Sequence, residues 1–359
     1  MRDRNELTRP AFAGIASYRP DDSGASIDLS DNTNRWGSPP AAIRELQQTR
    51  GSLARYPDCY SAPLRALLAD YAGIDAENVM VGAGSDDVLD AAIRAFGDHG
   101  DLLSFARPSF QMVPAFARMN GLRVASTPFA EDGDVDVDAL LAHGPAIAYV
   151  CSPNNPTGLP IPRATLERII ERANGIVIVD EAYAEFAGTS VLDLVGRSPR
   201  LLVVRTLSKA WGLAGLRVGY GIAQPTLVSE IEKSRGPFTV SAPSERCAAA
   251  AVAEDGAWMR EHVAMAIESR DRLIRALRTR GYAPLDSAAN FVLLPLLGAQ
   301  AAAASLRARG IAVRVFESLD MPHHAIRDAG GNALRISVGP PPEMDALLDG
   351  LDAWRSACV

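Results

Sequence analysis

Lys209 is the residue whose type and position most favour covalent chemistry. It follows the apolar segment 201–204, for which we expect a buried strand, so the lysine stands just past the end of that strand. Burial lowers the pKa of a lysine toward the range in which its neutral amine is a nucleophile. The hydroxyls of Thr206 and Ser208 and the guanidinium of Arg217 are close in sequence, and such groups bind phosphate. A nucleophilic amine beside a phosphate site is what pyridoxal phosphate requires, whereas a surface Ser-Lys turn is the alternative for these residues alone.

Asp180 is the second candidate, because it ends the apolar run 176–179. A buried carboxylate needs a positive partner, since an unpaired buried charge is costly. The protonated ring nitrogen of pyridoxal phosphate is one such partner, and the pairing strengthens the ring as an electron sink. A helix cap or an ion pair with an arginine is the alternative. Tyr183 either donates a hydrogen bond to the phenolic oxygen of the ring or packs in the core.

Two loops and one arginine carry further polar groups. Gly84, Ser85 and Asp86 stand between a short expected strand and a helix, where backbone amides bind anions, although an N-cap is the simpler interpretation. Asn155 lies between two prolines in the stretch 151–158, which is either a binding loop or a structural turn. Arg335 occupies the expected strand 333–338, either facing the surface or presenting its planar fork to an anionic substrate group.

The elements that must position these residues alternate along the chain. After a strand at 79–81 come apolar segments separated by helical patterns at 88–96, 109–119, 137–142 and 162–173. The expected strands are 102–105, 123–127, 146–150, 176–180, 201–205 and 218–222. This alternation predicts an α/β fold, a three-layer arrangement with a mostly parallel sheet covered on both faces, in which ligands bind at the carboxyl ends of the strands.

The pattern changes past residue 222. Long helices are expected at 242–254 and 257–280, and then shorter strands at 290–294, 311–315 and 333–338 with helices at 299–309 and 342–353. We expect a smaller α+β domain there. The predicted organisation is an N-terminal arm at 1–28, packing with the small domain or a partner subunit, a large cofactor-binding domain at 29–255 and a small domain at 256–359.

Composition excludes several classes of function. The 359 residues include 48% hydrophobic and 22% charged residues, as in ordinary globular proteins, and the net charge of -7 disfavours nucleic acid or an anionic membrane as the partner. The four cysteines lack metal-ligand or disulfide-framework spacing. No apolar run reaches the length of a membrane span, and the charged N-terminus is unlike a signal peptide. We therefore expect a cytoplasmic protein without a metal.

These motifs occur together in one chain and in one order, and each stands at the end of a strand. The chain thereby resembles the pyridoxal-phosphate aminotransferases of fold type I (class I/II), and within them the histidinol-phosphate aminotransferase group. The resemblance extends from about residue 28 to the end. It rests on Tyr56-Pro57-Asp58, Gly84 through Asp87, Cys151 through Gly158, Asp180 through Phe186, Arg205 through Gly219, Asn290-Phe291 and Leu334 through Gly339.

The resemblance implies a role for each residue around the cofactor ring. Lys209 would hold pyridoxal 5'-phosphate as a Schiff base and shuttle the proton between Cα and C4′. Asp180 would pair with the pyridinium nitrogen, while Asn155 and Tyr183 would hydrogen-bond the phenolic oxygen. Phe110 falls where family members stack an aromatic ring, commonly tyrosine, on the cofactor.

The resemblance also implies the phosphate and substrate contacts. Ser208, Arg217 and the amides of Ser85 and Asp86 would hold the phosphate, with Gly84 and Thr206 contributing to the same site. Tyr56 would reach the phosphate of the other subunit's cofactor, which requires a homodimer. Arg335 would bind the anionic group of the substrate, and Arg314 either assists it or is a plain surface residue.

The N-terminal loop departs from the family pattern. Family members commonly show Asn-x-Asn-Pro-Tyr-Gly, whereas this chain has Asn32 through Gly37 with Arg35 and Trp36 in place of the proline and tyrosine. Asn32 and Trp36 are substrate-binding candidates in this loop, which helps to cover the substrate in the family.

The expected reaction is transfer of an amino group between L-histidinol phosphate and 2-oxoglutarate, with imidazole-acetol phosphate as the keto partner. Three alternatives are an aromatic or broad-specificity amino-acid aminotransferase, a lyase resembling threonine-phosphate decarboxylase, and a cofactor-binding module without catalysis. The acidic balance and the absence of an N-terminal helix-turn-helix pattern disfavour the last.

Overall fold

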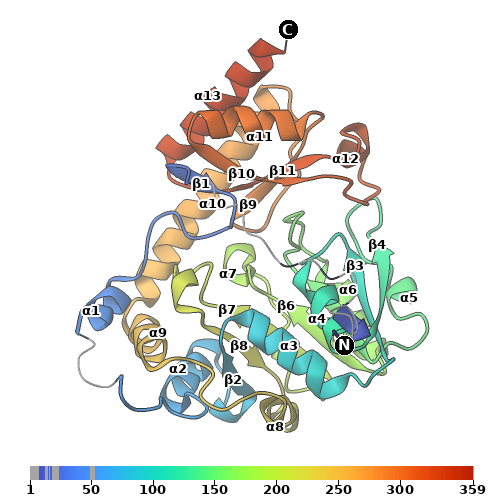
Figure 1. Cartoon of the computed structure of the whole chain (residues 1–359), viewed down its shortest axis with the longest axis vertical. Helices are drawn as coiled ribbons and strands as arrows, with labels where there is room; N and C mark the ends of the chain where they lie inside the picture. The colour runs from blue at the N-terminus through green and yellow to red at the C-terminus, as the bar shows by residue number, and fades with distance from the viewer. Residues whose placement is uncertain (1–7, 13–14, 16, 18–23, 49–52, 359) are drawn as a thin grey trace, which may run out of the picture.

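A computed structural model describes residues 8–12, 15, 17, 24–48 and 53–358 of the chain. Most of the expected N-terminal arm lies outside these residues. The structure contains a seven-stranded sheet and a four-stranded sheet, which are built from different parts of the sequence. Figure 1 shows the larger sheet with its helices below and the smaller sheet, with α11 and α13, above.

The larger sheet has the strand order β2-β8-β7-β6-β5-β3-β4. Strand β8 is antiparallel to both of its neighbours, and the other adjacent strands are parallel. The strands are β2 (Val79–Gly82), β3 (Leu102–Arg107), β4 (Arg123–Pro128), β5 (Ile147–Cys151), β6 (Ile176–Asp180), β7 (Leu201–Thr206) and β8 (Gly219–Ile222). The predicted mostly parallel sheet is therefore confirmed.

Both faces of this sheet are apolar because successive residues of a strand point to opposite sides and both sides are covered by helices. Along β6, Val177 and Val179 belong to one hydrophobic core and Ile178 to the other. Helices α3 (Ser85–Phe96), α4 (Met112–Met119) and α8 (Pro225–Lys233) cover the Ile178 side. Helices α2 (Ala62–Ala72), α6 (Arg163–Arg172) and α9 (Ala242–Glu254) cover the other side.

The smaller sheet has the strand order β1-β10-β11-β9. Its strands are β1 (Ile27–Leu29), β9 (Phe291–Pro295), β10 (Ile311–Phe316) and β11 (Ala333–Ser337). Helices α11 (Ala299–Ala308) and α13 (Pro341–Ala357) pack on it around a third hydrophobic core. Helices α1 (Pro40–Gln48), α5 (Val137–Leu140), α7 (Ala184–Ala187) and α12 (His324–Asp328) are the other described α-helices apart from α10.

Helix α10 (Gly256–Thr279) connects the two sheets. Met259 and Val263, near its beginning, pack in a core of the large sheet, whereas Leu273 and Leu277 pack in the core of the small sheet. We propose the expected division into domains at residues 255 and 256, where α10 begins. Strand β1 pairs with β10, so the chain joins the small sheet before it enters the large one.

Most expected elements are present, with a few differences. Strand β1 and helices α7, α8 and α12 were not expected from the sequence, although Pro225 at the first turn of α8 is a helix-start signal. The helix expected at 109–119 begins only at Met112. The residues before it, Ser109 to Gln111, form a loop that lines the cavity described below.

Candidate active site

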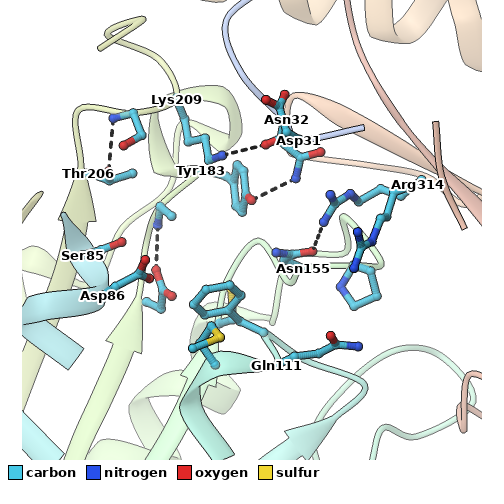
Figure 2. A pocket seen from close by; sticks show the side chains of 18 of the residues that line it. Asp31, Asn32, Ser85, Asp86, Gln111, Asn155, Tyr183, Thr206, Lys209 and Arg314 are labelled. Carbon is cyan, nitrogen blue, oxygen red and sulfur yellow. Dashed lines mark hydrogen bonds between the residues drawn. The ribbon is translucent and has the colours of Figure 1, made fainter. Parts of the chain in front are cut away.

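A cavity of about 610 Å³ lies where the two sheets meet. Its walls come from strand ends of the large sheet, from the Asn32 segment and from β10 and β11 of the small sheet. Figure 2 shows these side chains converging on one space. The cavity is lined by the predicted site residues Asn32, Ser85, Asp86, Phe110, Asn155, Asp180, Tyr183, Thr206, Ser208, Lys209, Arg217, Arg314 and Arg335.

Strand direction explains why residues distant in sequence meet here. The carboxyl ends of parallel strands share one edge of a sheet, so Cys151, Asp180 and Thr206 end β5, β6 and β7 at the same edge. Strand β8 is antiparallel to β7, so its first residue, Gly219, pairs with Thr206 at this edge. Arg217, two residues before Gly219, therefore lies near the same edge.

Lys209 is partly buried, and its Nζ donates a hydrogen bond to the backbone carbonyl of Asp31 at 3.1 Å. Figure 2 shows this contact across the top of the cavity. Burial and, to a smaller extent, the positive charge of Arg335 lower the pKa of Lys209 to about 8, against the opposite effects of Asp31 and Asp86. About a tenth of the amine is therefore neutral at pH 7, far more than for an ordinary lysine, and the neutral amine is the nucleophile.

Asp180 is buried, with 4% of its surface exposed. Its Oδ2 accepts a hydrogen bond from the hydroxyl of Tyr149 at 2.9 Å, and its Oδ1 accepts one from the amide of Ala182 at 3.1 Å. Burial raises the pKa of Asp180 to about 6, while the two hydrogen bonds lower it. The site thus contains a buried carboxylate that a cation would stabilise.

Tyr183 is held by the N-terminal segment. Its hydroxyl accepts a hydrogen bond from Nδ2 of Asn32 at 3.1 Å, as Figure 2 shows. The backbone of Asn32 is itself held, since its amide donates to Ser337 Oγ at 2.8 Å and its carbonyl accepts from Asn290 at 3.0 Å. Asn32 therefore ties the small sheet to the tyrosine beside Asp180.

A concave group of donors suited to phosphate lies at the start of α3. Ser208 has a buried Oγ that finds no hydrogen-bond partner in the described part of the chain. Arg217 has a left-handed backbone, with φ of 53°, and its Nη2 approaches Asp86 at 3.4 Å. Gly84 has a φ of 87°, and a Cβ there would lie 2.5 Å from Nη2 of Arg217. The positive φ favours glycine at this position, and a Cβ there would displace the guanidinium of Arg217.

Two arginines form the opposite wall. Arg314 and Arg335 are directly opposite each other in the antiparallel pair β10–β11. Arg335 donates to Asn155 Oδ1 and to the carbonyl of Ser30, each at 2.7 Å, and is buried. The alternative of a surface-facing Arg335 is therefore wrong. Like charges directly opposite on adjacent strands repel each other, so this wall favours an anion.

Three predicted site residues do not line this cavity. Gly84 precedes Ser85, and a Cβ at this glycine would contact the guanidinium of Arg217 on the expected phosphate side of the cavity. The ring of Trp36 packs between two hydrophobic cores. Tyr56 is 82% exposed and stacks on Phe238, with ring centroids 4.7 Å apart.

The structure adds residues that the sequence analysis missed. Gln111, Met112 and Phe316 line the cavity, and the hydroxyl of Tyr149 donates a hydrogen bond to Asp180. The strand position of Tyr149, two residues before Cys151, was the available signal, because both residues then face the same side of the sheet.

These residues fit pyridoxal 5'-phosphate. The buried Asp180 carboxylate, the amine of Lys209 with its lowered pKa and the unpartnered Oγ of Ser208 are the groups that a pyridinium nitrogen, an aldehyde and a phosphate would satisfy. Within the described residues, no cluster of histidine, cysteine, aspartate and glutamate could hold a metal ion. No helix in those same ranges is long and apolar enough to cross a membrane.

Comparisons with known proteins agree with this geometry. The family model "Aminotransferase class I and II" matches residues 25–351. A histidinol-phosphate aminotransferase of Roseiflexus castenholzii is 37% identical over 371 residues, covering 96% of this chain and 97% of the relative. An aromatic amino acid aminotransferase of Rhodococcus opacus is 36% identical over 351 residues, covering 95% and 94%. The crystal structure of histidinol-phosphate aminotransferase from Sinorhizobium meliloti in complex with pyridoxal-5'-phosphate is similar with a TM-score of 0.88 and 25% identity, covering 98% of each chain.

Proposed function

The chain belongs to the class I and II aminotransferases and is a pyridoxal-phosphate-dependent transferase, and from this premise we propose that it moves an amino group between L-histidinol phosphate and 2-oxoglutarate. Several relatives that carry the name histidinol-phosphate aminotransferase support this choice, at 32% to 37% identity. The proposed activity is a step of histidine biosynthesis.

The cofactor, when bound, supplies an aldehyde that takes up the amino group and a ring that stabilises negative charge at the substrate's Cα. Lys209 is the proposed proton carrier, and its lowered pKa makes the neutral amine accessible. Asp180 is proposed to hold the ring nitrogen in its protonated form. Asn155 and Tyr183 are proposed to face the phenolic oxygen, since both line the cavity beside Asp180.

The remaining cofactor contacts follow from the walls of the cavity. We assign the phosphate to Ser208, Thr206 and Arg217 and to the backbone amides of Ser85 and Asp86 at the N-terminus of α3, where the helix favours an anion. Phe110 lines the same space and offers an aromatic face for stacking on the ring.

The paired arginines are the observation that carries the choice of substrate. A carboxylate is a monoanion and matches one guanidinium, whereas a phosphate monoester carries nearly two charges at neutral pH. The side chain of Arg335 is held by Asn155 and Ser30, while the side chain of Arg314 forms no hydrogen bond or ion pair with any described residue. A dianion between them would relieve their mutual repulsion, so we propose that both bind the substrate phosphate.

The second candidate is an aromatic amino-acid aminotransferase. Phe110 and Phe316 line the cavity, and the Rhodococcus opacus relative bears that name at 36% identity. An aromatic amino acid would place its carboxylate on Arg335 and would leave Arg314 unused.

Single-turnover reactions with different amino donors test the proposal. The loaded protein should lose its cofactor absorption band on adding L-histidinol phosphate and regain it on adding 2-oxoglutarate. Phenylalanine, tyrosine and threonine phosphate are the comparison donors. A reaction with phenylalanine but not with L-histidinol phosphate would favour the second candidate, and release of carbon dioxide from threonine phosphate would show a lyase.

Substitution of Arg314 sharpens this test. Arg314→Met keeps much of the side-chain volume and removes the charge, and we expect kcat/KM for L-histidinol phosphate to fall about 10- to 100-fold, the loss of one charged hydrogen-bonding partner. Phenylalanine should lose less than about threefold because its carboxylate needs only Arg335. Arg309→Met, which removes an exposed arginine at the end of α11, is the control. An equal loss with both donors would contradict the assignment of Arg314 to phosphate.

We also propose that the protein is a cytoplasmic homodimer. Tyr56 is exposed, its ring stacks on Phe238, and it does not line the cavity of its own chain. This supports the proposal that Tyr56 contributes to the site of a second copy. The four cysteines all lie in the described residues and form no disulfide, as is usual in reducing compartments. Sedimentation would test the dimer. Mixed dimers of Lys209→Ala and Tyr56→Ala subunits would test the shared site, because only one of their two sites would retain both residues.

A further inference from the structure

Tyr149 is a buried residue beside the candidate active site to which no role has been given above. It lies in the middle of β5, its surface is fully buried, and its hydroxyl donates a hydrogen bond to Oδ2 of Asp180 at 2.9 Å. A buried tyrosine hydroxyl needs a partner, and here the partner is the carboxylate that faces the cofactor ring.

The geometry of the parallel pair β5–β6 explains how the contact forms. Cys151 is the register partner of Asp180, and Tyr149 stands two residues earlier on β5, on the same face of the sheet. The side chain of Tyr149 is long enough to reach the diagonal position on the neighbouring strand. It therefore reaches Asp180 from the neighbouring strand, and Tyr149 itself is not among the residues that line the cavity.

The surroundings of Asp180 leave few other sources of stabilisation. In the described ranges, no arginine, lysine or histidine forms an ion pair with it, and its second hydrogen bond is the Ala182 amide. Asp86 and Glu181 add negative charge that raises its pKa further, and the neutral side chains of Cys151 and Tyr183 face it. Burial raises the pKa of Asp180 to about 6, so the hydroxyl of Tyr149 acts on a group that is close to titrating at neutral pH.

We propose that Tyr149 is a positioning residue for the cofactor: its hydroxyl orients the Asp180 carboxylate toward the ring nitrogen and keeps it charged. The inference rests on the proposed function, in that it needs pyridoxal phosphate on Asp180, but it does not depend on which amino donor reacts. Without the hydroxyl, the carboxylate would keep one hydrogen bond, and the proton would move from the ring nitrogen to Asp180 more readily.

Tyr149→Phe removes only this hydroxyl, and titration of cofactor-free protein with pyridoxal 5'-phosphate is the first measurement. We expect the affinity to fall about tenfold, as for the loss of one hydrogen bond to a charged group. The acid limb of the pH profile of kcat/KM should move to higher pH by about one unit. The reason is that the Asp180 carboxyl, without the Tyr149 hydroxyl as donor, keeps its proton to higher pH. A purely structural role would not shift that limb.

Tyr220→Phe is the matched control. Tyr220 is equally buried, lies in β8 of the same sheet, and its hydroxyl is near Arg205 instead of Asp180. This variant should keep the cofactor affinity and the pH profile of the natural chain. A shift of the same size in Tyr220→Phe would show that any buried hydroxyl of the sheet has this effect and would overturn the proposal.

Asp180→Asn provides the background that isolates the contact. In Asp180→Asn protein, Tyr149→Phe should change the cofactor affinity less than about threefold, because the charge that the hydroxyl holds is gone. An unchanged affinity in Tyr149→Phe alone, or an equal loss in both backgrounds, would refute the proposal. Failure of Tyr149→Phe to fold in both backgrounds would do the same. Natural protein that binds no pyridoxal phosphate would instead refute the proposed function.

Discussion

Asp180→Asn should make the cofactor-free protein more stable at high pH while it weakens cofactor binding. Asp180 is buried, its pKa of about 6 is raised by burial, and its ordinary value is 3.8. A carboxyl whose pKa is raised by folding contributes its full stability below the unfolded pKa and loses it as the pH rises through the folded pKa. The shift of about two units corresponds to about 3 kcal/mol at pH 8.

The substitution also has a cost, because one amide oxygen replaces two carboxylate oxygens. Tyr149 and Ala182 then compete for one acceptor, and an unsatisfied buried donor costs about 1 to 2 kcal/mol. The net gain at pH 8 is therefore about 1 to 2 kcal/mol. The change of this gain with pH is the better test. About 1.4 kcal/mol of the destabilisation caused by the ionised Asp180 carboxylate develops between pH 5 and pH 8.

Urea unfolding of the cofactor-free proteins at pH 5 and pH 8 measures this difference. The free energy of unfolding of Asp180→Asn relative to the natural chain should increase by about 1.4 kcal/mol between the two pH values. Asp193→Asn is the control, because the guanidinium of Arg163 lowers the pKa of that exposed carboxyl, so Asp193 is ionised in both folded and unfolded chains at pH 5 and at pH 8, and the difference for this variant should not change between them. A difference for Asp180→Asn that does not vary with pH would refute the reasoning. Added pyridoxal phosphate should stabilise the natural chain more than the variant.

Three further predictions concern the residues around the cofactor. Lys209→Ala should abolish turnover, by at least about 10³-fold, and a near-normal 1,3-proton shift in stopped-flow absorbance would contradict its role. Gly219→Ala should weaken cofactor binding more than about tenfold, because its Cβ would lie 2.2 Å from the backbone nitrogen of Ser85. An equilibrium titration with the cofactor checks this, and Gly215→Ala, where a Cβ meets open space, is the control. The rate at which cofactor-free protein captures pyridoxal phosphate should rise as the pH passes about 8, the pKa of Lys209, and a rate independent of pH between 6 and 9 would argue against the free amine as nucleophile.

The sequence predicted the frame of the large sheet well because that frame depends on local patterns. Strand β6 and helix α9 have the expected bounds, since a short apolar run and a capped amphipathic segment are recognisable without tertiary information. The loop at Ser109 to Gln111 was assigned to a helix, and the three-residue strand β1 was missed. Their conformations depend on the cavity and on β10, which lie far away in the sequence.

Lys209 and Asp180 each had a structural alternative when taken alone, and it was the occurrence of the strand-end motifs together, in one order, that indicated their chemistry. For Arg335 the sequence left two interpretations open, since strand alternation does not say what covers each face. The structure decides between them, because Ser30 and Asn155 reach Arg335 from other parts of the chain.

By itself, therefore, the sequence predicted pyridoxal-phosphate chemistry through Lys209, Asp180 and the order of the strand-end motifs, with an aminotransferase as the expected enzyme and a lyase as an alternative. Only the tertiary structure decided the neighbours of these groups: the carbonyl of Asp31 on Lys209, the hydroxyl of Tyr149 on Asp180 and Arg314 opposite Arg335. The physical reason is that nucleophilicity, charge and hydrogen-bonding capacity belong to single side chains. The pKa and the fit to a dianion arise from groups that meet only when two sheets close around one cavity.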